Sequence, residues 1–432
     1  MRTFTFGFGT GTQSVEIPED CVRSVIEGRP APAVDVKEAA LDAMRRPIGS
    51  APLAETVKKG DKVCIICADV TRSWNRSDQF VIHVVNELNL AGIPDEDITI
   101  LFAQGTHRTQ TREEDIRVVG EEAARRIRLI QHDSRDKDGL VLVGTTTLGT
   151  PVWINKHAAE ADKIILVNGI TTHLFAGYSG GRKLILPGVA GWDTIQSNHC
   201  HALADTFGGG VNPKTRATVL EDNPVSDDMQ EAADMLAPCF LIHSVINAEG
   251  EICRIVGGDP HEAWMEGVRE VARTQRAEYA ERADVTFACA GGYPKDVNLY
   301  QGSKFYDAAA ETTKKGGVII AIVEAREIGD PPEFMASFAY ETEADMERDL
   351  RKRFTIPFFA AFNLFCMAHK YTIYMVTKKE NFDAVRRTGQ IPAETVEDAW
   401  RMAREKLAAE GKTDITVNIM PHGGAVIPVL KQ

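Results

Sequence analysis

Short apolar runs alternate with helical patterns along most of the chain. Three of these runs end in polar or glycine-containing loops, at GDKVCIICADVTR (60–72), DITILFAQGTHR (97–108) and ADKIILVNGITTH (161–173). The stretch DQFVIHVVNELNLAGI (78–93) lies between the first two and is apolar at helical spacing, with Ser77 or Asp78 as the expected N-cap. Strands that alternate with helices predict a parallel sheet in an α/β domain.

A second unit of the same kind is expected after the charged helical stretch 262–283. Its first strand is DVTFACAGGYP (284–294), a helix follows from about Gln301, and the next strand is VIIAIVEA (318–325). The tail TDITVNIMPHGGAVIPVL (413–430) is strand-like but broken by glycine, and its pattern fits either unit. The pattern therefore predicts two α/β units and leaves the tail unassigned.

Length and charge limit the classes of protein to consider. The 432 residues are enough for two or three domains with cores of their own. A net charge of −13 argues against a general nucleic-acid-binding protein, because a phosphate backbone requires a basic surface. We see no continuous apolar segment near the N-terminus and no stretch long enough to cross a bilayer, so we expect a cytoplasmic protein without a membrane partner.

The eight cysteines are scattered along the chain, which fits the same compartment. Cys64 and Cys67 form a C-x-x-C pair, but residues three apart on a strand face opposite sides of the sheet. We therefore expect ordinary core thiols rather than a metal or redox pair.

Reactive side chains follow the expected strand ends, where ligands bind in open α/β sheets. In chain order they are Asp69 and Arg72, His107 and Arg108, Asn168 and His173, and, in the second unit, Lys295, Tyr300, Gln301 and Lys304. Histidine exchanges protons near neutral pH, so two histidines on opposite sides of a substrate suit a reaction that inverts a stereocentre. The arginines and the lysine would anchor a carboxylate. The competing interpretation is that these are ordinary surface residues of loops.

The segment Tyr178–Lys183, YSGGRK, is similar to a phosphate loop, because glycines let backbone N–H groups approach an anion. It lacks the Gly-Lys-Ser/Thr of the ATP-binding motif, since Leu184 follows Lys183, so ATP hydrolysis is disfavoured. Lys183 fits either a plain glycine turn, with its stem along an apolar surface, or a lysine that binds a cofactor covalently. His199, in SNHCH, fits either a metal ligand or the end of a helix, and the spacing is a weak zinc pattern.

Three motifs in combination closely resemble the lactate racemase family, and the resemblance covers nearly the whole chain. They are QGTHR (104–108), HLFAGYSGGRKLILPGVAGWDTIQSNH (173–199) and GGYPKDVNLYQGSK (291–304). That family uses a nickel-pincer nucleotide. The resemblance implies that Lys183 holds this cofactor covalently through a thioamide and that His199 is the protein ligand of the nickel. It also implies that His107 and His173 are the paired acid and base.

The resemblance assigns further residues to the substrate and the cofactor. The implied contacts of the substrate are Arg72, Lys304, Gln301 and Tyr300. The implied contacts of the cofactor include Asp69 and, near its phosphate, Ser179, Gly180, Gly181 and Arg182.

The implied activity is a racemase or epimerase of a small 2-hydroxy acid. One histidine removes the hydroxyl proton, hydride moves reversibly from C2 to the cofactor, a planar 2-keto acid forms, and the second histidine returns a proton. Two alternatives stay open. One is a non-catalytic carrier of the cofactor, which would need only Lys183 and His199, and the other is a hydro-lyase or hydrolase with a plain divalent metal.

The resemblance to the family also implies a domain organisation and further partners. It implies two α/β domains with parallel-type sheets, residues 1–275 plus 413–432 and residues 276–412, with the active-site cleft between them. Enzymes of cofactor biosynthesis would be needed to load the protein.

The chain departs from the family at two places. The loop after the first strand reads Arg72-Ser-Trp74-Asn75-Arg76 where the family often has proline, and FFAAFNLFCMAHKY (358–371) lacks the usual glycine. If Arg72 holds the substrate carboxylate, Asn75 and Arg76 are left for a second polar group, such as that of malate or a sugar acid. The competing interpretation is that Arg76 faces solvent and pairs with a surface acid.

Overall fold

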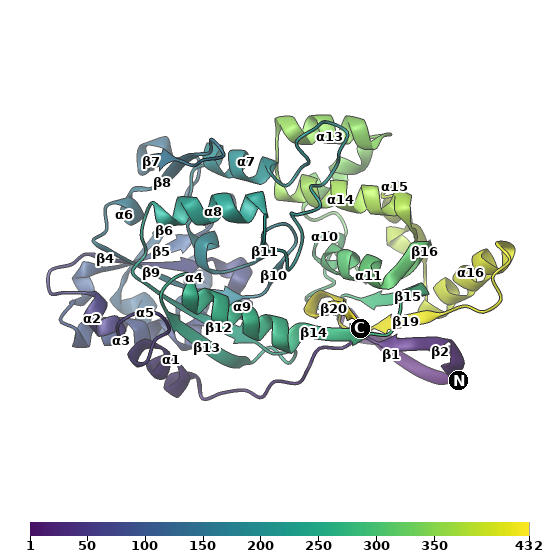
Figure 1. The fold of residues 1–432 in the computed structure, drawn as a ribbon, viewed down its shortest axis with the longest axis horizontal. Coiled ribbons are helices and arrows are strands. Elements are labelled where there is room, and N and C mark those ends of the chain that lie inside the picture. The colour runs from purple at the N-terminus through teal and green to yellow at the C-terminus, as the bar shows by residue number, and fades with distance from the viewer. Residues whose placement is uncertain (432) are drawn as a thin grey trace. The chain divides into compact units, whose positions relative to one another are not determined.

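The computed structural model describes residues 1–431, and the chain forms two compact units. One unit, which we call the N-unit, consists of Pro30–Asp205 and Asn212–Thr274. The other, the C-unit, consists of Met1–Arg29, Thr206–Val211 and the chain from Gln275 onward. Each unit has its own six-stranded sheet, so the two halves do not share one continuous sheet (Figure 1).

The sheet of the N-unit has the strand order β13-β12-β9-β4-β5-β6. Its strands are β4 (Val63–Ala68), β5 (Ile98–Ala103), β6 (Arg128–Gln131), β9 (Lys163–Ile170), β12 (Phe240–Ile246) and β13 (Ile252–Gly258). All neighbouring pairs are parallel except β12 and β13. Every residue of β4 is buried, as expected for a central parallel strand covered on both faces. The three strands predicted from apolar runs are confirmed.

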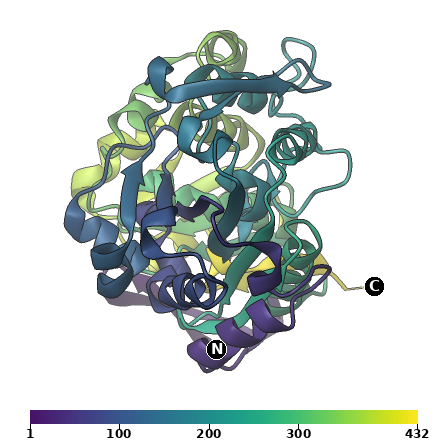
Figure 2. The ribbon, with the colours of Figure 1, turned by 90° about the vertical axis from the view of Figure 1, so that its left-hand side faces the viewer.

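Helices flank this sheet, and two small hairpins complete the unit (Figures 1 and 2). The helices are α1 (Val36–Arg45), α2 (Leu53–Thr56), α3 (Val81–Leu90), α4 (Arg112–Val119), α5 (Glu121–Arg126), α6 (Lys156–Ala159), α7 (Trp192–Cys200), α8 (Pro224–Asp234) and α9 (Glu262–Gln275). The hairpins pair β7 (Leu140–Thr145) with β8 (Pro151–Asn155) and β10 (Thr172–His173) with β11 (Gly177–Tyr178). Val84 and Leu88 of α3 pack in one core with Ile65 and Ile165 of the sheet.

The predicted N-cap of α3 is wrong. Ser77 and Asp78 lie in a 3₁₀ turn (Ser77–Gln79), and the helix begins only at Val81, after Phe80. The Ser77 hydroxyl donates to the carbonyl of Val118 at 2.7 Å instead of capping the helix. The Cys64 and Cys67 thiols are buried and unpaired by disulfides, and burial raises the pKa of both, in agreement with core thiols.

The sheet of the C-unit has the order β18-β17-β16-β15-β19-β3, and all its pairs are parallel. Its strands are β3 (Val22–Val25), β15 (Ala283–Cys289), β16 (Thr313–Ile322), β17 (Thr372–Val376), β18 (Ile391–Ala393) and β19 (Val417–Met420). Its helices are α10 (Leu299–Gly302), α11 (Tyr306–Thr312), α12 (Pro332–Ala336), α13 (Glu343–Lys352), α14 (Ile356–Lys370), α15 (Phe382–Arg387) and α16 (Val396–Ala409). A strand at β15, a helix near Gln301 and a strand at β16 were predicted and are confirmed.

The assignment of the tail (413–432) to the N-terminal domain is wrong. Within the described residues, β19 lies beside β15, with Val417 opposite Val285, and β20 (Ile427–Leu430) pairs with β14 (Arg276–Tyr279). All four residues of β19 are buried, which is the reason it occupies an inner position of the C-unit sheet.

The N-terminal residues also belong to the C-unit rather than to the N-terminal domain. The hairpin of β1 (Arg2–Phe8) and β2 (Gly11–Ile17) places Phe4, Phe6, Val15 and Ile17 in the core of the C-unit. The short segment Thr206–Val211 is held there as well, because the Glu347 carboxylate accepts hydrogen bonds from the backbone of Gly208 and Gly210, both at 3.1 Å. Across the described residues, the helices are all too short or too polar to cross a membrane.

Candidate active site

Three adjacent parallel strands of the N-unit bring four of the predicted residues to one edge of its sheet. In the order β9-β4-β5, Asp69 and Arg72 follow β4, His107 follows β5, and His173 lies on β10, just after β9. Ligands of open α/β sheets bind at this edge, beyond the carboxyl ends of the strands.

Asp69 and His107 form a close pair. The His107 Nδ1 atom lies 2.6 Å from Oδ2 of Asp69, and the Thr71 hydroxyl donates to Oδ1 at 2.6 Å. Burial raises the pKa of Asp69, but the hydrogen bond and charge of His107, with Arg72 and Thr71, outweigh it and hold that pKa below its usual value. The ionised carboxylate accepts the Nδ1 proton, so Nε2 of neutral His107 is the atom that can take up a proton. Asp69 was expected at the cofactor, and the structure assigns its carboxylate to His107.

Three of the predicted residues lie around the aromatic ring of Phe175. Its centroid lies 4.7 Å from the His173 ring and 5.0 Å from the His199 ring, and Lys183 Nζ lies 5.6 Å from it. Phe175 is fully buried. The hairpin β10–β11, the glycine turn and α7 therefore meet at one aromatic side chain.

His173 has the opposite tautomer to His107. The backbone N–H of Ala176 donates to Nδ1 of His173 at 3.3 Å. A neutral imidazole that accepts at Nδ1 carries its proton on Nε2. In their neutral forms, His107 thus presents a hydrogen-bond acceptor at Nε2, whereas His173 presents a hydrogen-bond donor at Nε2.

Lys183 and His199 both favour the uncharged state. Lys183 keeps part of its surface accessible, while burial, together with the charges of Arg182 and Arg72, holds the pKa of its amine well below the usual value. Burial, followed by the charge of Lys183, holds the pKa of His199 well below its usual value. A neutral amine is a nucleophile, and a neutral imidazole is the form that binds a metal.

The glycine turn before Lys183 is fixed by the protein itself. Gly180 and Gly181 have φ values of +76° and +52°, which glycine adopts without strain. The Gly181 N–H donates to Nε2 of His243 at 2.8 Å, and the Trp264 indole N–H donates to the Ser179 carbonyl at 2.9 Å. This turn positions Lys183.

Arg182 points into the protein rather than presenting a surface for phosphate. Its guanidinium carbon lies 4.1 Å from the Trp264 ring centroid, and its nitrogens donate to the Ser226 hydroxyl at 2.7 Å and to the Ala176 carbonyl at 3.0 Å. The Gly181 N–H and the Nε and Nη2 atoms of Arg182, expected at the phosphate, thus have partners within the N-unit, while Nη1 of Arg182 is buried without a hydrogen-bond partner among the described residues.

Tyr300, Gln301 and Lys304 lie together in the C-unit, after β15. Tyr300 and Gln301 are on α10, which Asn298 caps by accepting from the Gln301 N–H at 2.8 Å. Lys304, in the following 3₁₀ turn, donates to the Gln301 side-chain oxygen. The structure brings these three predicted residues to one helical segment.

Asn75 and Arg76, which were expected to bind a second polar group of the substrate, interact with other residues of the protein instead. The Asn75 side chain is buried and bonds Asn168 at 2.9 Å and the Ser77 N–H at 2.8 Å. Arg76 is in the left-handed region, with φ of +58°, and its Nε lies 3.5 Å from Asp78 Oδ1. The competing interpretation, in which Arg76 pairs with a surface acid, is the one that the structure shows.

The segment 358–371, the second departure from the family, is mostly part of helix α14. It buries Phe358, Phe359, Phe362 and Phe365, so these aromatic side chains serve the packing of the C-unit.

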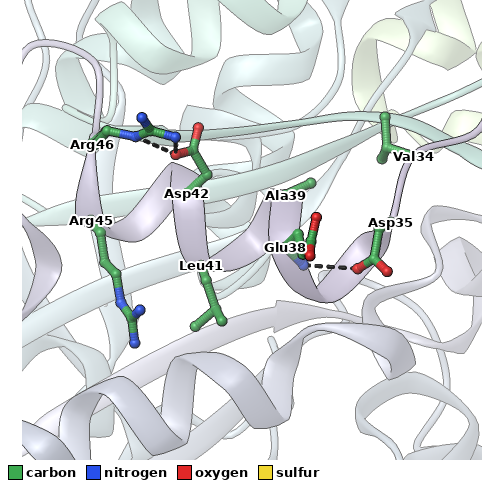
Figure 3. A pocket seen from close by; sticks show the side chains of 8 residues that line it. All are labelled: Val34, Asp35, Glu38, Ala39, Leu41, Asp42, Arg45 and Arg46. Atoms are coloured by element: carbon green, nitrogen blue, oxygen red, sulfur yellow. Dashed lines mark hydrogen bonds and ion pairs between the residues drawn. The ribbon is translucent and has the colours of Figure 1, made fainter.

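A surface groove along α1 has no part in this arrangement. Its lining consists of Val34, Asp35, Glu38, Ala39, Leu41, Asp42, Arg45 and Arg46 (Figure 3). Its polar groups are engaged locally, with Asp35 capping α1 through the Glu38 N–H at 2.9 Å and Asp42 paired with Arg46. It shares no residue with the cluster around Phe175.

The sequence motifs missed the supporting residues Phe175, His243 and Trp264. Within the described residues, no three His, Cys, Asp or Glu side chains come together as a metal site.

Comparison with known proteins identifies the family. The family profile of the lactate racemase N-terminal domain matches residues 8–208, and that of the lactate racemase C-terminal domain matches residues 279–428. The chain is 28% identical to a lactate racemase of Thermoanaerobacterium thermosaccharolyticum, with 99% of each chain covered, and 30% identical to one of Lactiplantibacillus plantarum, with 88% of each covered. The chain therefore belongs to the lactate racemase family, an isomerase family.

Solved structures agree with this assignment. The lactate racemase apoprotein of Thermoanaerobacterium thermosaccharolyticum superimposes with a TM-score of 0.88 at 28% identity and covers 99% of this chain and 100% of its own. A protein of Thermotoga maritima superimposes with a TM-score of 0.65 at 19% identity, which shows a shared fold.

Proposed function

We propose that this protein is a racemase or epimerase of a small 2-hydroxy acid, with a nickel-pincer nucleotide bound covalently at Lys183. The observation that supports it most is the different partner at Nδ1 of each histidine, from which opposite tautomers of the neutral rings follow. His107 presents an acceptor nitrogen backed by Asp69, and His173 presents a donor nitrogen. A reaction that runs equally in both directions needs one group of each kind.

The residues around Phe175 fit the cofactor that the family uses. The pKa of the Lys183 amine is held well below its usual value, which favours the neutral form that a thioamide link requires, and the lowered pKa of His199 favours the neutral imidazole that would bind nickel. When bound, the cofactor would accept hydride from C2 of the substrate and return it. His199 would then hold the metal, and the fixed turn Ser179–Lys183 would hold the nucleotide in place.

The residues of the chain would handle the carboxylate and the protons. Arg72, partly exposed beside Thr71, would bind the substrate carboxylate, with Lys304, Gln301 and Tyr300 as further proposed contacts. Nε2 of His107 would take the hydroxyl proton, and the Asp69 carboxylate would stabilise the imidazolium. To return a proton, His173 would have to be in its imidazolium form, which gives its Nε2 proton to the substrate oxygen as hydride returns to C2 and so becomes neutral; the reverse reaction exchanges the two roles.

For the substrate, we propose a small 2-hydroxy acid without a required second anion. Arg76 pairs with Asp78 and Asn75 is buried in structural hydrogen bonds, so neither residue supports a preference for malate or a sugar acid. Trp74 lies against Gly169, where a side chain would approach its ring to 3.1 Å. Trp74 is therefore a proposed wall of the substrate side-chain site.

An enzyme is favoured over a carrier because a carrier has no need for the Asp69–His107 pair. The test is a screen of loaded protein, produced with the cofactor biosynthesis enzymes, against enantiopure 2-hydroxy acids from lactate to malate and gluconate. We expect at least one acid to approach an equal mixture of epimers at C2. Loaded protein that converts no acid of the series would leave the carrier as the better proposal.

A further inference from the structure

The first turns of α8 hold the side chain of Asn198 in one orientation. The Asn198 Nδ2 atom donates to the carbonyl of Val225 at 3.1 Å and to Oδ2 of Asp228 at 2.8 Å. Both partners only accept hydrogen bonds, so the amide nitrogen must face α8. The amide oxygen, Oδ1, then faces away from α8.

That oxygen lies against the neighbouring histidine. Oδ1 of Asn198 is 2.9 Å from Nδ1 of His199. An amide oxygen has no proton to give, so the proton in this contact belongs to Nδ1 of His199. In neutral His199 the acceptor nitrogen is then Nε2.

Asp228 is itself fixed behind Asn198. It is 1% exposed, and its carboxylate accepts from the hydroxyls of Thr146 at 2.5 Å and Thr150 at 2.9 Å. The Thr146 hydroxyl accepts from the Thr150 N–H at 3.1 Å, which leaves its proton for Asp228. The donors thus converge on Asp228: Thr146, Thr150 and the Asn198 amide donate to its carboxylate, and His199 in turn donates to the amide oxygen of Asn198.

We propose that Asn198, oriented by Asp228, is the positioning residue that selects the tautomer of His199, so that Nε2 is the atom that ligates the metal. The inference rests on the proposed function for the identity of the ligand, but the tautomer is a property of the protein alone. Histidine ligands of metals commonly donate their second N–H to a carboxylate, carbonyl or water, and loss of that partner lowers metal affinity.

The same part of α8 also holds Arg182, the residue before Lys183. Ser226 accepts from Arg182 through its hydroxyl at 2.7 Å and through its carbonyl at 3.2 Å. Asn223, the N-cap of α8, donates to the carbonyl of Phe175 at 2.9 Å. The first turns of α8 therefore contact Arg182 next to Lys183, the backbone of Phe175 and, through Asn198, His199.

The first experiment measures the tautomer directly in the full-length apoprotein. Histidine is labelled with ¹⁵N, solid-state NMR spectra are recorded near pH 8, and the His199 signals are assigned by their loss in His199→Gln. We expect Nδ1 of His199 to carry the proton and Nε2 to give the signal of a bare nitrogen. A proton on Nε2 would overturn the proposal, and this wild-type measurement needs no folded Asn198 variant.

The second experiment compares Asn198→Ala with Gln196→Ala, a matched loss of an amide on the same helix outside this chain of hydrogen bonds. In the apoprotein, Asn198→Ala is expected to populate both tautomers of His199, while Gln196→Ala keeps that of the wild type. In loaded protein, Asn198→Ala should keep the nucleotide mass but lose nickel to EDTA roughly 10- to 100-fold faster. An unchanged tautomer or unchanged nickel retention in Asn198→Ala would contradict the role.

The proposed activity and the proposed role of Asn198 can be refuted independently of each other. Racemisation by the wild type together with a proton on Nε2 of His199 would refute the role of Asn198 and leave the activity. A proton on Nδ1 in a protein that, once loaded, converts no 2-hydroxy acid would refute the activity and leave the tautomer assignment.

Discussion

One hydrogen-bond partner at Nδ1 of His107 and one at Nδ1 of His173 assign the protons of the two neutral rings to different nitrogens. The Asp69 carboxylate takes the Nδ1 proton of His107, and the Ala176 N–H occupies Nδ1 of His173. At the scale of single residues, the proposed acid and base are thus distinguished by their hydrogen bonds rather than by their residue type.

His107→Ala and His173→Ala are each expected to lower turnover by about 10²–10⁴-fold, because each removes one proton-transfer group. The loss should be present in both directions of the reaction, and the covalent cofactor mass should remain. Chiral chromatography of the product and intact-protein mass measure the two effects. His157→Ala, on α6, is the control, and turnover near the wild-type level in both active-site variants would make these histidines structural.

Lys183→Ala should carry no covalent nucleotide after production with the cofactor biosynthesis enzymes. Lys183→Arg should also fail, since a guanidinium does not form the same thioamide. Intact-protein mass is the readout, with Lys59→Ala as an exposed-lysine control. The full added mass in Lys183→Ala would show that the cofactor is attached elsewhere.

Residues from two secondary-structure elements hold the short backbone turn before Lys183. His243 from β12 and Trp264 from α9 hold the backbone of Ser179 and Gly181 from two elements. Burial lowers the pKa of His243 to about 4, and as a neutral side chain it accepts the Gly181 N–H.

This turn predicts a dependence of stability on pH. The folded-state pKa of His243, about 4, lies below the ordinary 6.5, so the unfolded chain binds the proton first as the pH falls. The contribution of His243 is therefore complete above pH 6.5 and declines between 6.5 and 4, by roughly 3 kcal/mol in total. His243→Gln keeps an acceptor for Gly181 but does not titrate. Urea unfolding from pH 8 to pH 4.5 should show a shallower pH dependence for this variant, and equal slopes would contradict the assignment.

Secondary-structure elements could be predicted from the sequence where the pattern of apolar residues fits only one kind of element. The buried run Val63–Ala68 can hardly form anything but an inner strand, and it is β4. The motif around Lys183 identified the lysine, but not its supports, because a lone histidine in the apolar strand Phe240–Ile246 looks like any core residue. The start of α3 was misplaced because Ser77 prefers a tertiary hydrogen bond to a helix cap.

The scale of the whole molecule is where sequence reasoning was weakest. Residues 1–29 and the tail join the C-unit, although they are far apart in the chain. The local pattern of apolar residues predicts that β19 is a strand. It does not predict which strand lies beside β19, because that depends on packing between residues far apart in the chain. The two units divide between Thr274 and Gln275, at the end of α9, and β14 and β15 then follow in the C-unit.

Phe6→Ala tests this assembly. Phe6 is 1% exposed and stacks on Phe287 at 6.0 Å, and removal of a core phenylalanine typically costs about 3–5 kcal/mol. Hydrogen exchange should accelerate in β1, β15 and β19 of the C-unit and stay unchanged in β4 and β9 of the N-unit. Phe102→Ala, in the core of the N-unit, is the matched control and should give the reverse pattern. Equal acceleration in both sheets after Phe6→Ala would argue against two separately stabilised units.

The most direct test of the proposed activity follows the hydrogen at C2 of the substrate. Loaded wild-type protein is incubated in ordinary water with a single enantiomer of a converted 2-hydroxy acid that carries deuterium at C2, and both enantiomers are separated and analysed by mass spectrometry. Reversible hydride transfer, with His107 and His173 moving only the hydroxyl proton, should leave the deuterium in both enantiomers. Replacement of the deuterium by solvent hydrogen in the product enantiomer would show proton abstraction at C2 and would contradict the account.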